Sequence, residues 1–477
     1  MFKFKSQAPL LTFFRINSIF QVITLLLLFL LIRLPYIGNL QPLLSQELEW
    51  MLVGEKLNEG LHLYNEILTQ IGPFSAFVYQ IVDLWAGKSQ FFYEAVALIL
   101  IFIQTLYFVF IVNKRNLLNE KNYVSGLFFL ILMSMSFDIQ KLSPSLLANT
   151  FILISLNVTL RQIEKRDGLG DDIFEIGLFL GIATLFHLSS FIFIFWAIIV
   201  LFLFTGVNIR QLFMVLLAFF LPLILVFIYF FFKEHNSDFI NLWLFNFNNV
   251  LDLSLLGIKD ILIIFSIPLL FTILGIFKVL KITRYNSFQN RAHQLLIIFG
   301  IFSFISLLFS KEFIPSNLVS FIPFISLFVS GFFLHSKKLF FQEVLSLIFI
   351  FSILVIQYLG SNKINNKSLN ILKNYKVIET QLPKKYENKR IFITGEGMDA
   401  YKSHKMATGY LSWELAKSDF ENPNNYVSIV NIYTNFKKDL PEVIIDNEGV
   451  MKKIFKNIPT LSLKYTYLDK NIYELKN

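Results

Sequence analysis

The chain has 477 residues, of which 55% are hydrophobic, and Phe alone occurs 57 times. This apolar fraction exceeds that of ordinary soluble domains and indicates a protein of the lipid bilayer. The absence of cysteine excludes disulfides, thiolate metal sites and a cysteine nucleophile. The formal net charge of +9 is modest and concentrates in loops between apolar segments, so it favours membrane topology over nucleic-acid binding.

Apolar segments long enough to cross a bilayer recur along the first 360 residues. The predicted fold class is therefore an α-helical polytopic membrane protein, residues 1–360, followed by a small α/β soluble domain, residues 361–477. The first apolar segment lacks a small-residue cleavage site, so we expect it to remain as a span. We predict eleven spans, at residues 18–37, 90–112, 122–137, 145–160, 173–187, 189–206, 211–232, 259–277, 293–309, 316–335 and 339–359.

Basic residues decide how the apolar segment Pro73–Ala86 is interpreted. It is short and carries Asp83. If it lies on the outer surface, every strongly basic loop falls on the opposite side of the membrane, and the positive-inside rule places the N-terminus in the cytoplasm. We therefore expect a multi-pass protein of the bacterial inner membrane, with the first loop (residues 38–89) and the C-terminal domain outside.

The first outer loop is predicted to contain two surface helices. Ser45 can cap a helix that ends at Gly60. Its apolar flank allows this helix to lie in the membrane interface. The pair Gly72-Pro73 breaks the chain, and residues 74–86 form the second helix, which ends at Gly87.

This loop resembles that of the GT-C superfamily of membrane glycosyltransferases, which take a sugar from a polyprenyl-phosphate donor at the outer face. The resemblance rests on Gln46-Glu47, Gly60 with Tyr64, Gly72-Pro73 and Trp85-Ala86-Gly87. It implies a divergent bacterial hexosyl- or pentosyltransferase that uses a lipid-linked donor. The superfamily's usual acidic pair is Asp-Glu, however, and the amide of Gln46 cannot accept a proton at neutral pH.

Inverting sugar transfer needs a carboxylate that removes the acceptor's proton and cationic groups or a metal that neutralise the departing phosphate. The candidate catalytic residues are Glu47, Glu49 and Asp138. Each has an ordinary explanation as well, because the helix dipole favours acidic residues in a first helical turn and Asp138 lies in a short connection that solvent can reach.

Four lysines at the outer membrane edge, Lys88, Lys141, Lys233 and Lys311, oppose the topological charge bias. Each is a candidate for holding the lipid phosphate, and snorkelling towards headgroups is the alternative explanation. Glu94 is a further substrate-binding candidate because an ionisable residue inside a span is costly. Tyr64 joins them through the resemblance. No metal ligands are predicted, and a divalent metal cofactor is left open.

The tail after residue 360 reads as a soluble α/β pattern. We predict strands at Arg390–Thr394, Val427–Tyr433 and Glu442–Ile445, helices at Lys405–Lys417 and Gly449–Asn457, and a closing hairpin of Leu463–Tyr467 and Ile472–Leu475.

Three functions remain open at the level of sequence. The first is a glycosyltransferase with a glycan, lipid or protein acceptor in the envelope. The second, which Gln46 supports, is a non-catalytic GT-C-like scaffold or accessory subunit of an envelope assembly or secretion system, with partners in that complex. The third is a transporter, against which the sequence offers no internal repeat and no matched pair of broken helices.

Overall fold

The computed structural model describes residues 9–36, 41–165, 170–245, 256–282, 285–311, 313–335, 339–361, 372, 376–377, 384–386, 389–395, 397–468 and 471–476. The chain divides into two compact units. Unit 1 consists of residues 1–41, 93–228 and 247–373, and unit 2 of residues 42–92, 229–246 and 374–477.

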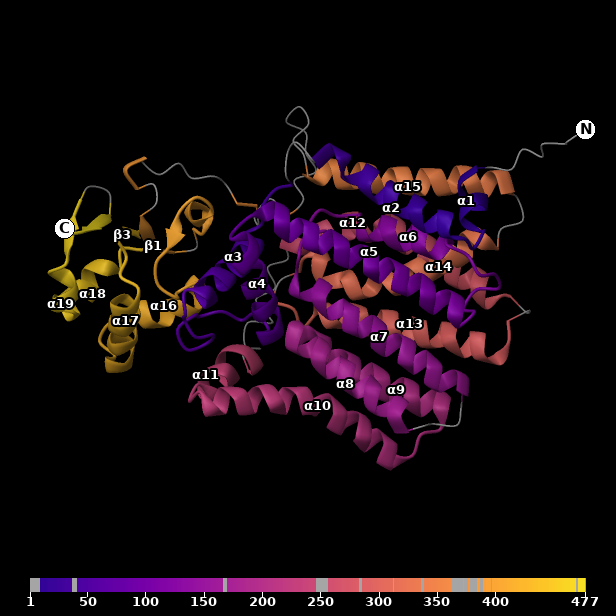
Figure 1. The fold of residues 1–477 in the computed structure, drawn as a ribbon, viewed down its shortest axis with the longest axis horizontal. Coiled ribbons are helices and arrows are strands. Elements are labelled where there is room, and N and C mark those ends of the chain that lie inside the picture. Colours follow the sequence, from indigo (N-terminus) through magenta and orange to yellow (C-terminus); the bar gives the residue numbers. More distant parts are fainter. Residues whose placement is uncertain are drawn as a thin grey trace, which may run out of the picture. The chain divides into compact units, whose positions relative to one another are not determined.

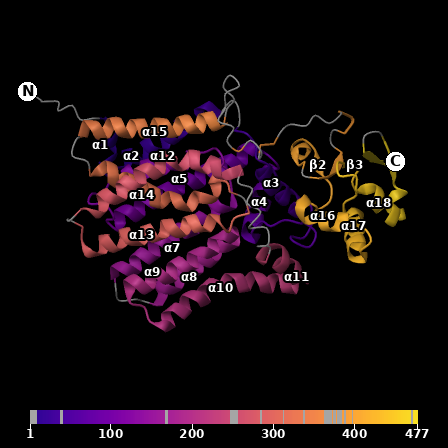
Figure 2. The ribbon, with the colours of Figure 1, turned by 180° about the vertical axis from the view of Figure 1, so that it is seen from behind.

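Unit 1 is a bundle of helices that lie side by side in two opposite views (Figures 1 and 2). Helix α7 packs against α8, and α12 packs against α14. The elements are α1 (Pro9–Phe14), α2 (Ile19–Arg33), η1 (Leu34–Tyr36), α5 (Gln90–Lys114), α6 (Val124–Met133), α7 (Pro144–Lys165), α8 (Gly170–Phe186), η2 (Leu188–Ile192), α9 (Phe193–Thr205), α10 (Ile209–Phe232), α12 (Leu256–Leu280), α13 (Ser287–Leu307), η5 (Pro315–Phe321), α14 (Ile322–Leu334) and α15 (Leu339–Ser361).

Nine helices among the described residues are long and apolar enough to cross a membrane, which confirms the predicted class of polytopic helical membrane protein. They are α2 with η1, α5, α7, η2 with α9, α10, α12, α13, η5 with α14, and α15. The two other predicted spans correspond to α6, with 10 residues, and α8, with 17. Every residue of α6 is buried, so protein neighbours and not lipid surround this short helix.

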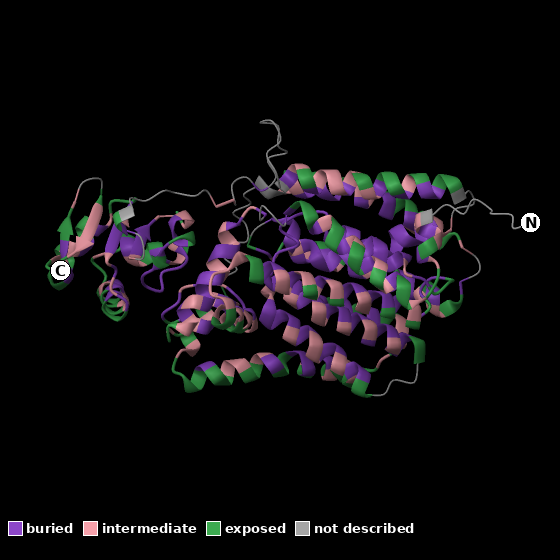
Figure 3. Ribbon diagram, turned by 45° about the horizontal axis from the view of Figure 1, so that its top comes forward, coloured by how far each residue is buried: buried purple, intermediate pink, exposed green. Residues whose placement is uncertain are grey.

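Burial separates central from peripheral helices of unit 1 (Figure 3). In the apolar window of the span that contains α14, 83% of the residues are buried, whereas in that of α10 only 22% are buried. Exposed apolar side chains on α10, such as Phe213 and Leu217, are those expected of a lipid-facing surface. Gly177 and Gly181 of α8 face carbonyls of α10, and the missing side chains allow the two backbones to approach closely.

Unit 2 combines two helices of the first loop with the small sheet of the tail. Its sheet has the order β2-β1-β3-β5-β4, in which β1 is parallel to β2 and β3, while β5 is antiparallel to β3 and β4. The elements are α3 (Ser45–Asn58), α4 (Pro73–Ala86), α11 (Asn236–Phe239), η3 (Ile240–Leu244), η7 (Lys384–Tyr386), β1 (Arg390–Thr394), η8 (Asp399–Lys402), β2 (Lys405–Met406), α16 (Trp413–Glu421), α17 (Tyr426–Lys438), β3 (Val443–Asp446), α18 (Met451–Asn457), α19 (Pro459–Ser462), β4 (Tyr465–Tyr467) and β5 (Ile472–Leu475).

Helix α4 has 14 residues, fewer than the ~20 that a span requires. Ala76 and Tyr79 are buried on one face, while Ile81, Leu84 and Trp85 are exposed. An apolar stripe of this kind suits a helix that lies along a membrane surface.

Two predictions for the tail were wrong. The segment predicted as a strand at Val427–Tyr433 is helix α17, because Asn425 caps its start and the core-facing Ile432 and Phe436 recur at helical spacing. The segment predicted as a helix at Lys405–Lys417 begins with strand β2, and helix α16 starts only at Trp413. Strands β1 and β3, helix α18 and the hairpin of β4 and β5 are confirmed.

Candidate functional site

A cluster of three charged side chains is buried in unit 1. Arg33 ends α2, Glu94 lies in α5, and Lys141 lies in the connection between α6 and α7. Glu94 accepts from Lys141 Nζ at 2.5 Å and from Arg33 Nη2 at 3.3 Å, and all three side chains are at most 7% exposed. Buried charges inside a membrane protein are costly unless paired, and they mark functional sites by default.

Gln140 connects this cluster to two other segments of unit 1. Its Oε1 accepts from Arg33 Nη1 at 2.5 Å, from Gln41 Nε2 at 3.0 Å and from Gln357 Nε2 at 3.4 Å. The Nε2 of Gln140 is buried and has no hydrogen-bond partner among the described residues. A buried amide donor without a partner carries a desolvation penalty, which an acceptor group on a ligand would remove.

An apolar groove adjoins this cluster. It has a volume of about 520 Å³ and runs between α2 and α15, and Gln357, which donates to Gln140, lines it. Leu31 and Phe351 on its walls are largely exposed, so the groove opens on the apolar outside of the unit. The remaining lining is almost entirely apolar, and includes Leu28, Ile32, Leu354 and Val355.

Asp138 is buried in the same connection as Gln140 and Lys141. Its Oδ2 accepts from the backbone N–H of Ser316 at 2.6 Å, and its Oδ1 accepts from the hydroxyl of Ser136. Burial raises the pKa of Asp138 to about 6, against the opposing effect of these hydrogen bonds. A carboxyl group that titrates close to neutral pH is suited to proton transfer.

The remaining predicted carboxylates lie in unit 2. Glu47 is buried in the first turn of α3. Glu49, in the same helix, accepts from Thr69 Oγ1 at 3.2 Å. Tyr64 is also buried, with a φ of 67° in the left-handed region, and its hydroxyl donates to the carbonyl of Ile71 at 2.7 Å. This bond holds the loop between α3 and α4 in shape.

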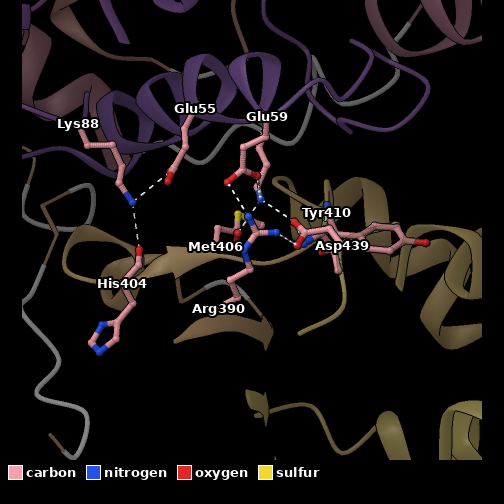
Figure 4. A network of polar contacts seen from close by, with 10 residues as sticks. Glu55, Glu59, Lys88, Arg390, His404, Met406, Tyr410 and Asp439 are labelled. Atoms are coloured by element: carbon pink, nitrogen blue, oxygen red, sulfur yellow. Dashed lines mark hydrogen bonds and ion pairs between the residues drawn. The ribbon is translucent and has the colours of Figure 1, made fainter. Parts of the chain in front are cut away.

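Lys88 forms an ion pair and a hydrogen bond within unit 2, whereas Lys311 of unit 1 is exposed. Lys88 Nζ lies 3.1 Å from Glu55 Oε2 and donates to the carbonyl of His404 at 3.0 Å (Figure 4). These contacts tie the first loop to the tail. These contacts therefore explain the presence of Lys88 at the outer side without any role in binding a lipid phosphate.

A second buried network in unit 2 centres on Lys56, which is 0% exposed. Its partners Glu59, Met406 and Asp439 are labelled in Figure 4. Its Nζ donates to Asp439 at 2.8 Å, to Glu59 at 2.7 Å and to the carbonyl of Met406 at 2.6 Å. Burial by itself would raise the pKa of Asp439, but Lys56 and Arg390 lower it below its ordinary value. This network joins α3 to the sheet, and we interpret its role as structural.

Of the predicted site residues, the structure brings Glu94 and Lys141 into direct contact, with Asp138 three residues before Lys141. Sequence reasoning missed Arg33 and Gln140. Arg33 ends an apolar span on the predicted outer side, so the charge argument applied to the lysines also applied to it. Among the described residues, no group of three His, Asp or Glu side chains is placed to hold a metal ion.

Comparison with known proteins identifies the fold. The sequence model of a family of unknown function, DUF6427, matches residues 65–365. No curated protein sequence matches the chain. ArnT from Cupriavidus metallidurans, solved with bound undecaprenyl phosphate, aligns with a TM-score of 0.57 and 11% identity over 96% of this chain and 98% of its own.

The Archaeoglobus fulgidus oligosaccharyltransferase in the apo form aligns with a TM-score of 0.51 and 10% identity over 96% of this chain and 75% of its own. The same enzyme, AglB, in complex with an inhibitory peptide and a dolichol-phosphate, aligns to the same extent. These neighbours are GT-C glycosyltransferases, and at such identities the likeness establishes the fold alone. The chain therefore has the GT-C fold, as the first loop predicted.

Proposed function

The chain belongs to the DUF6427 family, whose function is unknown, and from its GT-C fold we propose that it transfers a sugar from a polyprenyl-phosphate donor to an acceptor of the cell envelope. One observation carries this proposal: Gln357 lines the apolar groove between α2 and α15 and donates to Gln140, which in turn accepts from Arg33 of the buried Arg33–Glu94–Lys141 cluster. A prenyl chain fits an apolar groove open to lipid, and a phosphate fits two cations.

The chemistry of the cluster supports a phosphate as its ligand. Arg33 and Lys141 carry two positive charges, and Glu94 carries one negative charge. Gln140 adds an amide donor that has no partner among the described residues. The phosphate of undecaprenyl phosphate, the lipid bound in the ArnT structure, would accept from these groups.

In the proposed reaction, a carboxylate removes the proton of the acceptor hydroxyl, and the oxygen attacks the anomeric carbon of the donor sugar. The bond from that carbon to the phosphate oxygen breaks, and polyprenyl phosphate leaves with the electron pair. Arg33 and Lys141 stabilise the negative charge that develops on the leaving phosphate. We assign the base to Asp138 first, because it shares a connection with Gln140 and Lys141, and Glu47 and Glu49 are the other candidates.

We place this reaction at the outer face of a bacterial inner membrane, with the N-terminus in the cytoplasm. The distribution of basic loops supports this orientation. The donor is a polyprenyl-phosphate hexose or pentose, and the acceptor is a glycan, lipid or protein. In this scheme neither Lys88 nor Lys311 contacts the phosphate of the donor.

The test is turnover of radiolabelled polyprenyl-phosphate mannose, glucose, galactose and arabinose by the full chain in lipid nanodiscs. We expect Arg33→Gln, Lys141→Gln and Asp138→Asn each to lower the rate by about 100-fold or more. Arg210→Gln, which changes an exposed residue at the start of α10, is the control and should keep the wild-type rate. Glu47→Gln and Glu49→Gln are measured in parallel to identify the base. Wild-type rates in all five site variants would exclude this mechanism.

The alternative function is a non-catalytic GT-C-like scaffold of an envelope assembly or secretion system. Gln46, which replaces the acidic residue usual in GT-C enzymes, favours it. A scaffold would retain its cellular role when Asp138 or Glu47 is neutralised, and would lose it when residues 374–477 are removed. It would also co-purify with a fixed partner protein.

A further inference from the structure

Unit 2 contains a polar pocket that the proposed donor site does not use. Its volume is about 380 Å³, within the range of small-molecule sites. The loop after α3, the segment of α11 and η3, and the facing sides of α16 and α17 form its walls. Tyr64, predicted from the sequence as a substrate-binding residue, lines it.

Side chains that both donate and accept hydrogen bonds dominate the lining of this pocket. Carboxamides and hydroxyls of this kind pair with ligand hydroxyl groups, which also do both. Asn241, which contributes to this lining, is an exposed residue. The carboxamides and hydroxyls come from Asn65, Asn241, Ser418, Asn431, Thr434 and Asn435.

The charges around the pocket exclude an anionic ligand. Three carboxylates line it, those of Glu66, Asp238 and Asp419, against one cation, Lys438, which pairs with Glu66. Asn65 donates to Asp238 at 2.9 Å, and Asn431 donates to Asp419 at 3.3 Å. Each of these two carboxylates keeps further lone pairs that can accept from a hydroxyl. A phosphate or a uronic acid would be repelled.

Apolar side chains complete one wall. Tyr410, Leu242 and Leu415 line the pocket, and the Tyr410 ring is fixed by packing against Phe420 in the core of the sheet. Burial raises the pKa of Tyr410, so its hydroxyl stays protonated at neutral pH. A mixed lining of aromatic, aliphatic and amide groups suits a sugar ring, which has apolar C–H faces and a polar edge.

The pocket is built by main-chain contacts and is therefore pre-formed. The Leu68 N–H donates to the carbonyl of Gly409 at 2.9 Å, and the Ser412 N–H donates to the carbonyl of Leu68 at 3.2 Å. These bonds hold the loop that carries Tyr64 and Glu66 against the start of α16. Pre-organised walls lower the entropic cost of binding.

We propose that this pocket binds an uncharged, hydroxyl-rich sugar unit and that this unit belongs to the acceptor of the transfer reaction. The assignment of the bound sugar to the acceptor rests on the proposed function, whereas the binding of a sugar in this pocket does not. The pocket thus assigns the acceptor class as a neutral glycan, and it excludes phosphorylated or uronate-terminated chains from this site.

The experiment measures binding in the absence of any lipid-linked donor. Detergent-purified full chain is applied to immobilised saccharides that end in glucose, mannose, galactose, rhamnose or N-acetylglucosamine, and to matched saccharides that end in glucuronate or glucose 6-phosphate. Two tryptophan variants on α16 are compared. Ser418→Trp fills the pocket, and Lys417→Trp alters the neighbouring exposed residue outside it.

We expect wild type and Lys417→Trp to retain at least one neutral saccharide and to reject the anionic ones. Ser418→Trp should lose that binding by about tenfold or more, while its thermal unfolding matches that of Lys417→Trp. Retention of no neutral saccharide, equal retention of anionic ones, preference for a polycation such as spermine, or unchanged binding by Ser418→Trp would overturn the inference. Since donor turnover depends on Arg33 and Lys141, its failure in the separate assay would leave the saccharide result intact.

Discussion

Lys56 is a residue type that is almost never fully buried, yet no part of it is exposed in unit 2. It is tolerated there because all three protons of its ammonium group have acceptors, in Asp439, Glu59 and the Met406 carbonyl. Arg390 occupies the other oxygen of Asp439. The network therefore stabilises the attachment of α3 to the sheet only while every member is present.

We predict that Lys56→Met destabilises unit 2 by about 3–5 kcal/mol, because removal of one partner leaves a buried carboxylate with incomplete compensation. The loss is measured as faster hydrogen exchange in peptides of β3 and α17, followed by mass spectrometry. Lys437→Met, at an exposed position of α17, is the matched control and should leave exchange unchanged. Equal exchange in both variants would show that the network contributes nothing.

The raised pKa of Asp138 leads to a prediction about how the rate of sugar transfer depends on pH. Because its pKa in the folded protein is about 6, the carboxyl group is mostly protonated below this pH and cannot accept a proton there. The rate of sugar transfer should therefore rise with pH up to about 6 and then level off. The measurement is kcat/KM against pH for wild type and Asp138→Asn. A wild-type profile without this inflection would remove Asp138 from the role of base.

At the scale of elements, the loop between α3 and α4 depends on Gly409. A side chain at this position would overlap the carbonyl oxygen of Glu66, because the two backbones pass each other in close contact. The Leu68 N–H to Gly409 carbonyl bond forms at the same crossing. Glycine is therefore required here for close approach.

Gly409→Ala should separate the loop from the start of α16, at a cost of about 1–3 kcal/mol. The Leu68 amide should then exchange about tenfold faster or more, as read by hydrogen exchange. The control is Gly397→Ala, where a Cβ would meet nothing within 4 Å. If both variants exchange alike, the crossing has room for a side chain. Saccharide binding to the pocket should fall in Gly409→Ala only.

The helices of unit 1 were predictable because their length and apolar composition are local properties. Strands β1 and β3 were predictable for the same reason. Helix α17 was not, because Val427 and Tyr433 have high β propensity and the helical spacing of Ile432 and Phe436 becomes decisive only against a core. Ser45, expected as a cap, is instead the first residue of α3.

At the scale of the whole molecule, we expect a lipid that binds in the groove between α2 and α15 to stabilise the folded protein. A ligand that binds only the folded state stabilises it by about 2.7 kcal/mol when present at 100 times its Kd. Polyprenyl phosphate should therefore raise the Tm of the full chain in detergent. The corresponding prenol, which lacks the phosphate, should raise it much less.

The Arg33→Gln variant provides the decisive comparison for this prediction. It should respond to polyprenyl phosphate no more than to the prenol, since the groove remains and the cation is lost. A Tm increase of equal size in wild type and variant would mean that the lipid binds without contact to the cluster.

The sequence by itself determined the class of this protein and its GT-C resemblance, and it selected several polar residues as candidates for the site. Hydrophobic length, charge bias and turn chemistry act over short stretches of chain, so they can be read without a structure. Lys141 and Glu94 were selected in this way, each as a separate candidate.

Only the tertiary structure decided which polar residues lie in contact with one another. Gln140 and Gln357 are 217 positions apart in the chain, and Arg33 and Glu94 are 61 apart, yet they form one buried cluster. The pocket of unit 2 likewise joins Tyr64 with Asn431 from the tail. Such contacts depend on how helices pack, which is a property of the whole chain and leaves no pattern in local sequence.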